Sequence, residues 1–142
     1  MKKRILIIED NGETSFDLKE RLKAESFEVI KAYSHASAMG MWKRYNGAFD
    51  CVVLDLNIAS DGLTPQENNK YFPLNGLAFL IKIGWNEKTS LIPHLIVYSG
   101  YSNDLKSACK KHKIPYEELT AVSKKGISVA SLIETIKKKL NI

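Results

Sequence analysis

Residues 49–62 of the chain read FDCVVLDLNIASDG. The residues from Cys51 to Leu54 form a continuous apolar run, which is typical of a parallel strand that is covered on both faces. The run ends on the carboxylate of Asp55, and a carboxylate at the end of a buried strand is costly unless a cation meets it. The polar residues that follow show no clear secondary structure before the next apolar run, at Leu74. The stretch therefore predicts a buried strand that presents a carboxylate to a charged group.

Apolar runs like this one recur along the chain and alternate with segments of helical periodicity. Strands are expected at 4–8, 27–33, 49–54, 94–98 and 119–123. Helices are expected at 14–25, 35–45, 76–85 and 103–112, and a last helix follows Ser128 as its N-cap. This alternation predicts an α/β fold of the (βα)5 type. We expect one domain over residues 1–142, with a doubly wound, five-stranded parallel sheet in the flavodoxin-like order 2-1-3-4-5.

The spacing of apolar residues also predicts which side chains face the core. In the first helix Phe16, Leu18 and Leu22 are expected to point inward. The last helix has the clearest stripe, at positions i, i+3, i+4, i+7 and i+11 from Val129 to Leu140. The aromatic residues and methionines of the helices are interpreted as core.

Composition excludes several classes of protein. The 142 residues are 44% apolar and 26% charged, which fits a globular domain rather than a disordered chain. No apolar run approaches the roughly 20 residues of a membrane span, and the apolar start is too short for a signal peptide, so we expect a cytoplasmic protein without membrane contact. The net charge of +5 comes largely from lysines near predicted helix ends, so no direct contact with nucleic acid is expected. The two cysteines are expected to be reduced, and the scattered histidines do not predict a zinc site.

Charged and hydroxyl side chains end several of the predicted strands. In an open parallel sheet these ends meet at one edge, which is where ligands bind. The residues concerned are Glu9 and Asp10, Asp55, Ser99, and the pair Lys124 and Lys125. Three carboxylates repel one another, and a magnesium ion, which prefers oxygen ligands, would remove the conflict. A lysine and a serine beside them suit the transfer of a phosphoryl group to a carboxylate. Asp10, Asp55 and Ser99 also have a simpler interpretation, as parts of turns or as helix caps.

Four segments together carry a resemblance to a known family. They are IIEDN at 7–11, VLDLN at 53–57, VYSG at 97–100 and VSKK at 122–125. In this order, at the ends of four predicted strands, they resemble the receiver domains of two-component response regulators. The resemblance extends from Lys3 to Leu140.

The resemblance implies a function and a set of site residues. A receiver takes a phosphoryl group from a sensor histidine kinase or a phosphotransfer protein, and it is no enzyme beyond its own phosphotransfer and autodephosphorylation. It signals through a downstream protein target, and a homodimer is an alternative assembly. Because the chain ends just after the last predicted helix, no attached output domain is expected. The implied roles are phosphoacceptor for Asp55; Mg²⁺ ligands for Glu9, Asp10, Asp55 and the backbone carbonyl of Asn57; phosphoryl contact for Ser99; and phosphate pairing for Lys124, with Lys125 as the alternative.

The sequence departs from the family pattern in three places. Residues from about 59 to 75 are expected to be an inserted loop, because Pro65 and its polar neighbours make a poor amphipathic helix, and Gly76 rather than Gly62 is aligned with the family glycine. Strand five offers Ala121 or Val122 where the family has an aromatic switch residue, so Tyr98 and Tyr101 are alternatives. The proline that usually follows the family lysine is absent, and Lys125 takes its place.

Two other functions are weighed against this one. A phosphorylation-independent pseudo-receiver is favoured by the insertion and by the missing aromatic residue, but the intact strand ends oppose it. A flavodoxin-like FMN binder is disfavoured, because Glu9 and Asp10 would repel the phosphate.

Overall fold

The computed structural model describes residues 2–85, 94–125 and 127–142, and it contains one five-stranded sheet. Its strands are β1 (Arg4–Ile8), β2 (Glu28–Ala32), β3 (Cys51–Leu54), β4 (Leu95–Ser99) and β5 (Thr120–Ser123). Neighbouring strands are parallel, in the order β2-β1-β3-β4-β5. The predicted α/β class and strand order are confirmed.

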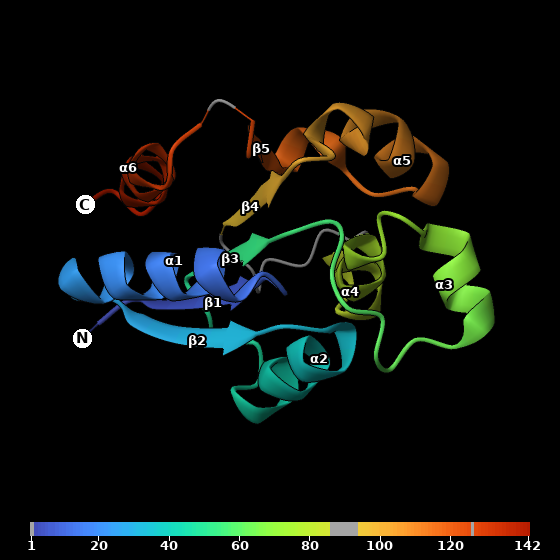
Figure 1. Ribbon diagram of the computed structural model, residues 1–142, viewed down its shortest axis with the longest axis horizontal. Helices are drawn as coiled ribbons and strands as arrows, with labels where there is room; N and C mark the ends of the chain where they lie inside the picture. Colours follow the sequence, from blue (N-terminus) through green and yellow to red (C-terminus); the bar gives the residue numbers. More distant parts are fainter. Residues whose placement is uncertain (1, 86–93, 126) are drawn as a thin grey trace.

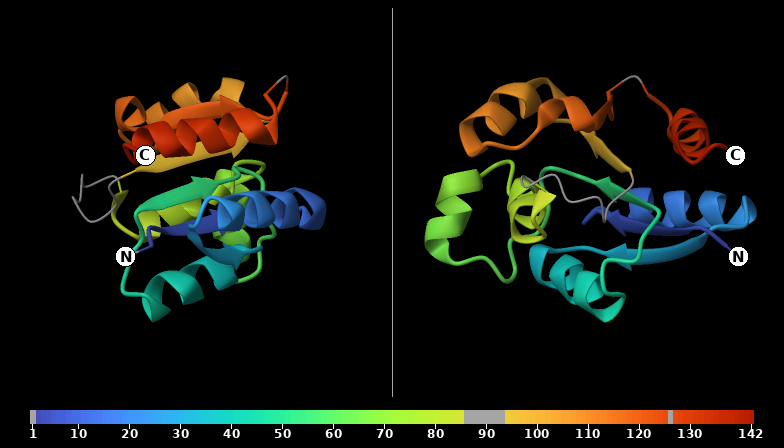
Figure 2. Two further views of the ribbon diagram at one scale, coloured as in Figure 1. Left: turned by 90° about the vertical axis from the view of Figure 1, so that its left-hand side faces the viewer. Right: turned by 180° about the vertical axis from the view of Figure 1, so that it is seen from behind.

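Helices lie on both sides of this sheet (Figures 1 and 2). They are α1 (Gly12–Ala24), α2 (His35–Arg44), α3 (Pro65–Tyr71), α4 (Gly76–Lys82), α5 (Leu105–His112) and α6 (Val129–Lys139). Two short 3₁₀ segments, Ser102–Asp104 and Tyr116–Glu118, flank α5. Among the described residues, no helix combines the length and the apolar character needed to cross a membrane.

The core consists of two layers, one on each face of the sheet. Leu6 and Ile8 of β1 belong to the cluster that includes the apolar residues of α2, α4 and α5. Ile5 and Ile7, which alternate with them, belong to the cluster that includes the residues of α1 and α6. All four side chains are fully buried. Burial on both faces explains why the inner strands β1, β3 and β4 have continuous rather than alternating apolar sequences.

The prediction that Phe16 points inward is wrong. Leu18 and Leu22 are fully buried, as expected, but Phe16 is 60% exposed. The buried face of α1 is formed by Ser15, Leu18 and Leu22. Phe16 lies two residues before Leu18, about 200° away around the helix, so the two side chains cannot face the core together.

The expectation that residues 59–75 contain no helix is also wrong, because α3 lies within them. Pro65 occupies the start of this helix, where its missing N–H is not needed. Thr64 caps it in a reciprocal arrangement: the N–H of Glu67 donates to Thr64 Oγ1 at 3.1 Å, and the N–H of Thr64 donates to Glu67 Oε1 at 2.9 Å. Local capping therefore begins a helix that has no amphipathic pattern.

Contacts with two neighbouring helices hold α3 in place on the outer side of α4 (Figure 1). Glu67 forms an ion pair with Lys82 of α4, with 2.9 Å between nitrogen and oxygen. The ring of Tyr71 lies against the ring of His112 of α5, with centroids 4.7 Å apart. Segment 59–75 is thus packed onto α4 and α5.

Gly76 begins α4 directly against the backbone that follows β3. Its N–H donates to the carbonyl of Leu56 at 2.7 Å. A Cβ at this position would lie 2.5 Å from the carbonyl oxygen of Asp55 and 3.1 Å from Cα of Leu56. Because both neighbours are backbone, only glycine allows α4 to approach Asp55 so closely.

This close approach predicts the effect of two matched substitutions. Gly76→Ala should lower the free energy of unfolding by about 1–3 kcal/mol, because the added methyl group displaces the backbone at Asp55. Gly40→Ala is the control: Gly40 lies within α2, and a Cβ there has no neighbour within 4 Å. This control should raise the free energy of unfolding by about 0.5–1 kcal/mol through helix propensity. Urea denaturation of both variants checks the prediction, and equal changes would contradict it.

Candidate functional site

Three carboxylates meet at the carboxyl edge of the sheet. Glu9 and Asp10 follow β1, and Asp55 follows β3. Ile8 pairs with Leu54 in the parallel register, so Glu9 and Asp55 leave the sheet side by side. Each of the three residues has a carboxylate oxygen that lies within 4.8 Å of a carboxylate oxygen of the other two. The sheet therefore brings together the acidic residues that the sequence singles out.

These carboxylates line an open cavity of about 320 Å³. Glu9 is 4% exposed and Asp55 is 7% exposed, whereas Asp10 is exposed. The residues that line the cavity are Glu9, Asp10, Asn11, Asp55, Asn57, Gly100, Tyr101 and Lys124. The lining residues come from the loops after β1, β3, β4 and β5.

Lys124 carries the ammonium group that reaches the carboxylates. Its Nζ donates to Glu9 Oε1 and, at 3.0 Å, to Asp55 Oδ2. Its backbone N–H donates to the carbonyl of Ser99 at 3.2 Å, which sets where the side chain leaves the backbone. The neighbouring Lys125 is exposed, and its N–H donates to Ser123 Oγ at 3.1 Å. Of the two lysines, Lys124 is the one placed beside Asp55.

Backbone N–H groups hold the other oxygens of the two buried carboxylates. The N–H of Asn11 donates to Glu9 Oε2 at 3.1 Å, and the N–H of Asn57 donates to Asp55 Oδ1 at 3.3 Å. The side chain of Asn11 also caps α1 by accepting from the N–H of Thr14 at 3.0 Å. The turn after β1 is therefore both a helix cap and part of the cavity wall.

The pKa values of the two acids after β1 are raised by burial first and by nearby negative charge second. Burial, together with the nearby charge of Asp55, raises the pKa of Glu9 to about 7, although Lys124 opposes this shift. Burial and the charge of Asp55 also raise the pKa of Asp10. Burial alone would lower the pKa of Lys124. The hydrogen bonds that Lys124 makes with Glu9 and Asp55, together with the negative charge of these two residues, outweigh burial and raise the pKa. One ammonium thus leaves the carboxylates incompletely neutralised.

This set of donors suits a magnesium ion. The candidate ligands Glu9, Asp10 and Asp55 offer only oxygen atoms, which hard divalent cations prefer. The raised pKa values of Glu9 and Asp10 also mean that added positive charge would be favourable there. Asn57 lines the same cavity, so its backbone carbonyl stays a candidate ligand.

Ser99 is placed differently from the acidic residues. It ends β4 and is fully buried, and its Oγ accepts from the N–H of Tyr101 at 3.2 Å. It is not among the described residues that line the cavity, whereas Gly100 and Tyr101 are. The structure thus brings the β4–α5 loop to the cavity, with the hydroxyl of Ser99 beneath it.

Aromatic residues near the site come from β4 and the loop after it rather than from β5. Tyr98 is 5% exposed, its hydroxyl donates to the carbonyl of Ile127 at 3.4 Å, and its ring centroid lies 5.7 Å from Lys124 Nζ. Tyr101 is 37% exposed at the cavity. The β5 positions hold Ala121 and Val122, as the sequence indicates.

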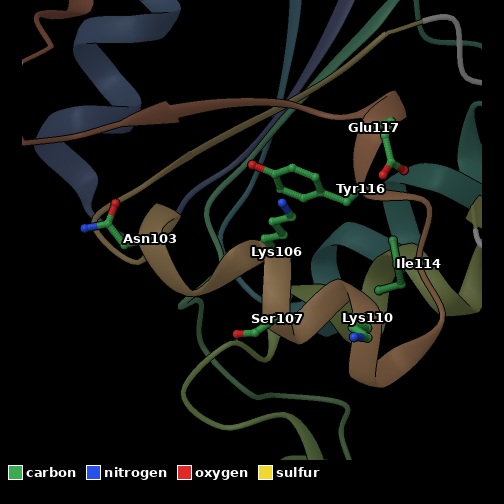
Figure 3. A pocket seen from close by; sticks show the side chains of 7 residues that line it. All are labelled: Asn103, Lys106, Ser107, Lys110, Ile114, Tyr116 and Glu117. Carbon is green, nitrogen blue, oxygen red and sulfur yellow. The ribbon is translucent and has the colours of Figure 1, made fainter.

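A second cavity, of about 580 Å³, lies between α5 and the segment before β5 (Figure 3). In the close-up, Lys106 extends from α5 toward the ring of Tyr116. The described residues that line this second cavity are Asn103, Lys106, Ser107, Lys110, Ile114, Tyr116 and Glu117. Only one carboxylate is among them, so this cavity has no counterpart of the paired acids after β1 and β3.

Comparison with solved structures shows which fold this is. The chain superposes on a CheY-like response regulator receiver domain protein from Methanospirillum hungatei JF-1 with a TM-score of 0.69 and 22% identity, covering 99% of this chain and 95% of that one. The non-phosphorylated HemR receiver domain from Leptospira biflexa gives 0.70 and 22%, covering 99% and 96%. A response regulator from Thermotoga maritima gives 0.66 and 19%, with both chains covered fully. No family model and no curated protein matches the sequence. The chain has the fold of receiver domains.

The raised pKa of Glu9 predicts how stability depends on pH when Mg²⁺ is absent. The folded protein binds this proton more tightly than the unfolded chain, whose glutamate has a pKa near 4.5. The stabilisation is complete below about pH 4.5 and is lost as the pH rises through about 7. Between pH 5 and 8 the free energy of unfolding should fall by about 1–3 kcal/mol more in the wild type than in Glu9→Gln. Urea denaturation at several pH values checks this, and parallel curves for the two proteins would contradict it.

Proposed function

We propose that the chain is a receiver domain that accepts a phosphoryl group on Asp55 from a histidine kinase or a phosphotransfer protein, and that it signals through protein contacts. The observation that carries the proposal is the geometry around Asp55. Its carboxylate lies at the edge of the sheet beside Lys124, with the carboxylates of Glu9 and Asp10 in the same cavity. The receiver fold supports this assignment. Acidic residues and a lysine are present at the strand ends, so there is no reason to favour a phosphorylation-independent module.

The transfer would proceed at the Asp55 carboxylate. One of its oxygens attacks phosphorus, the bond between phosphorus and the donor nitrogen breaks, and an aspartyl phosphate forms. Lys124 holds Oδ2 of Asp55 at 3.0 Å, and the N–H of Asn57 holds Oδ1, so the carboxylate is oriented before the donor arrives. Hydrolysis of the acyl phosphate by water returns the carboxylate and releases inorganic phosphate.

Magnesium would be held by Glu9, Asp10, Asp55 and the carbonyl of Asn57. When bound, it would neutralise charge on the transferring phosphoryl oxygens, as metal ions do in other phosphoryl transfers. The chain's own contribution is position: the parallel register places Glu9 beside Asp55, and Lys124 supplies a second positive charge. Because the transition state is loose, positioning and charge neutralisation account for most of the chemistry.

The direct test of the proposal is labelling with a small phosphodonor. The wild-type protein in Mg²⁺ and acetyl phosphate should gain the mass of one phosphoryl group, and the label should be lost at alkaline pH. Asp55→Asn should gain none while remaining folded, because the acceptor oxygen is replaced by an amide. Intact-protein mass spectrometry measures both. No label on the wild type, together with no binding of Mg²⁺, would overturn the proposal in favour of a pseudo-receiver.

The two adjacent lysines provide a matched pair of substitutions. Lys124→Ala should slow labelling by at least about tenfold, because it removes the cation that faces Asp55. The same change should strengthen Mg²⁺ binding, since the ammonium no longer competes for Glu9 and Asp55. Lys125→Ala, at an exposed position, should leave both quantities within about twofold of the wild type. Labelling time courses and calorimetric Mg²⁺ titrations test this, and equal effects of the two substitutions would contradict the role of Lys124.

A further inference from the structure

Asn75 is a buried polar residue at the end of segment 59–75. It is 3% exposed and directly precedes α4, where an asparagine would ordinarily cap the helix. Here its side chain makes no capping hydrogen bond to α4, and its backbone is already helical, with φ −65° and ψ −14°. The amide group therefore serves another purpose.

That amide is bound to both polar groups of Ile58, 17 residues earlier. Asn75 Oδ1 accepts from the N–H of Ile58 at 3.2 Å, and Asn75 Nδ2 donates to the carbonyl of Ile58. Ile58 is 2% exposed, so both hydrogen bonds are shielded from water. An amide side chain is suited to this pairing because it donates and accepts at once.

The residue held between these contacts is Asn57. On one side of it, the carbonyl of Leu56 accepts from the N–H of Gly76 at 2.7 Å. On the other side, Ile58 is bound by the amide of Asn75. Asn75 and Gly76 thus fix the backbone on both flanks of a residue that lines the acidic cavity.

The planarity of the peptide bond makes this clamp directional. The N–H of Ile58 and the carbonyl of Asn57 belong to the same peptide group, and in a trans peptide they point in opposite directions. Holding the N–H of Ile58 toward Asn75 therefore directs the carbonyl of Asn57 away from Asn75.

We propose that Asn75 is a positioning residue that orients the carbonyl of Asn57 toward the cavity formed with Glu9 and Asp55. The inference rests on the proposed function, in which that carbonyl is a ligand of Mg²⁺. It assigns Asn75 to the support of the site, although the residue lies at the far end of segment 59–75, 17 residues after Ile58. Groups that orient a metal ligand typically contribute 10–100-fold to metal affinity.

The test compares Mg²⁺ affinity in three proteins. Asn75→Leu keeps the branching at Cγ but lacks both hydrogen bonds, and it should bind Mg²⁺ about 10–100-fold more weakly than the wild type. Ile136→Val is the control for a general loss of stability, because Ile136 is fully buried on the opposite face of the sheet, in α6. The control should bind Mg²⁺ within about twofold of the wild type. Calorimetric titration with Mg²⁺ alone, well below the melting temperature of each protein, supplies the dissociation constants.

Labelling by acetyl phosphate gives a second readout that a purely structural role would not produce. In Asn75→Leu the Mg²⁺ concentration for half-maximal rate should rise with the dissociation constant, while the rate at saturating Mg²⁺ should stay within about threefold of the wild type. The amide resonance of Ile58 should also shift and exchange with solvent faster, since its acceptor is gone.

Asn75→Asp keeps the inference testable if Asn75→Leu does not fold. A carboxylate can still accept from the N–H of Ile58 but cannot donate to its carbonyl. This variant should therefore retain Mg²⁺ affinity within about fivefold of the wild type, and a loss of tenfold or more would overturn the proposal.

The outcomes separate this inference from the proposed function. If the wild type binds Mg²⁺ and is labelled, but Asn75→Leu binds Mg²⁺ as tightly as Ile136→Val, the positioning role is wrong and the receiver function stands. If the wild type neither binds Mg²⁺ nor is labelled, the proposed function fails and the inference fails with it.

Discussion

The arrangement of the site depends on one electrostatic constraint, which is that the parallel sheet collects carboxylates at a single edge. Because the strands are parallel and Ile8 pairs with Leu54, Glu9 and Asp55 must leave the sheet together. Both are buried, and burial, with a further contribution from the charge of Asp55, raises the pKa of Glu9 to about 7. The ammonium of Lys124 reaches them from beyond β5, which is three strands away from β1. This ion pair therefore joins opposite parts of the sheet while it lowers the cost of burying the acids.

The sequence predicts the sheet well because the signal for each strand is local. Continuous apolar runs such as Ile5 to Ile8 indicate burial on both faces, and the two core layers show why. The acidic cluster is equally predictable, since strand ends in a parallel sheet converge wherever the strands are in register. The choice between Lys124 and Lys125 depends on which side chain turns toward the edge, and the hydrogen bond from the N–H of Lys124 to Ser99 fixes this only in the folded chain.

The elements that the sequence does not predict are those stabilised by distant contacts. The helix α3 has a cap that a local search could find at Thr64 and Glu67, but its partners Lys82 and His112 lie 15 and 41 residues further along the chain from Glu67 and Tyr71, respectively. Phe16 was expected inside because it is apolar, yet Leu18 and Leu22 already fill the inward stripe of α1. Ser99 is fully buried, and its hydroxyl accepts from the N–H of Tyr101 in the turn after β4, a contact that periodicity does not indicate. Such outcomes depend on packing rather than on periodicity.

Segment 59–75 shows how a long connection can leave a site undisturbed. The entropy cost of closing a loop grows only slowly with its length, so extra residues matter less than how the two ends are joined. Here the ends are joined by the amide of Asn75 on Ile58 and by the N–H of Gly76 on Leu56. These bonds hold the backbone after Asp55 as a short connection would, while α3 is free to pack against α4 and α5. A displacement of α3 must therefore either strain the Ile58–Asn75 junction or be absorbed between residues 59 and 74. The burial of Ile58 and Asn75 favours absorption within the segment, which would leave the carboxylate edge in place.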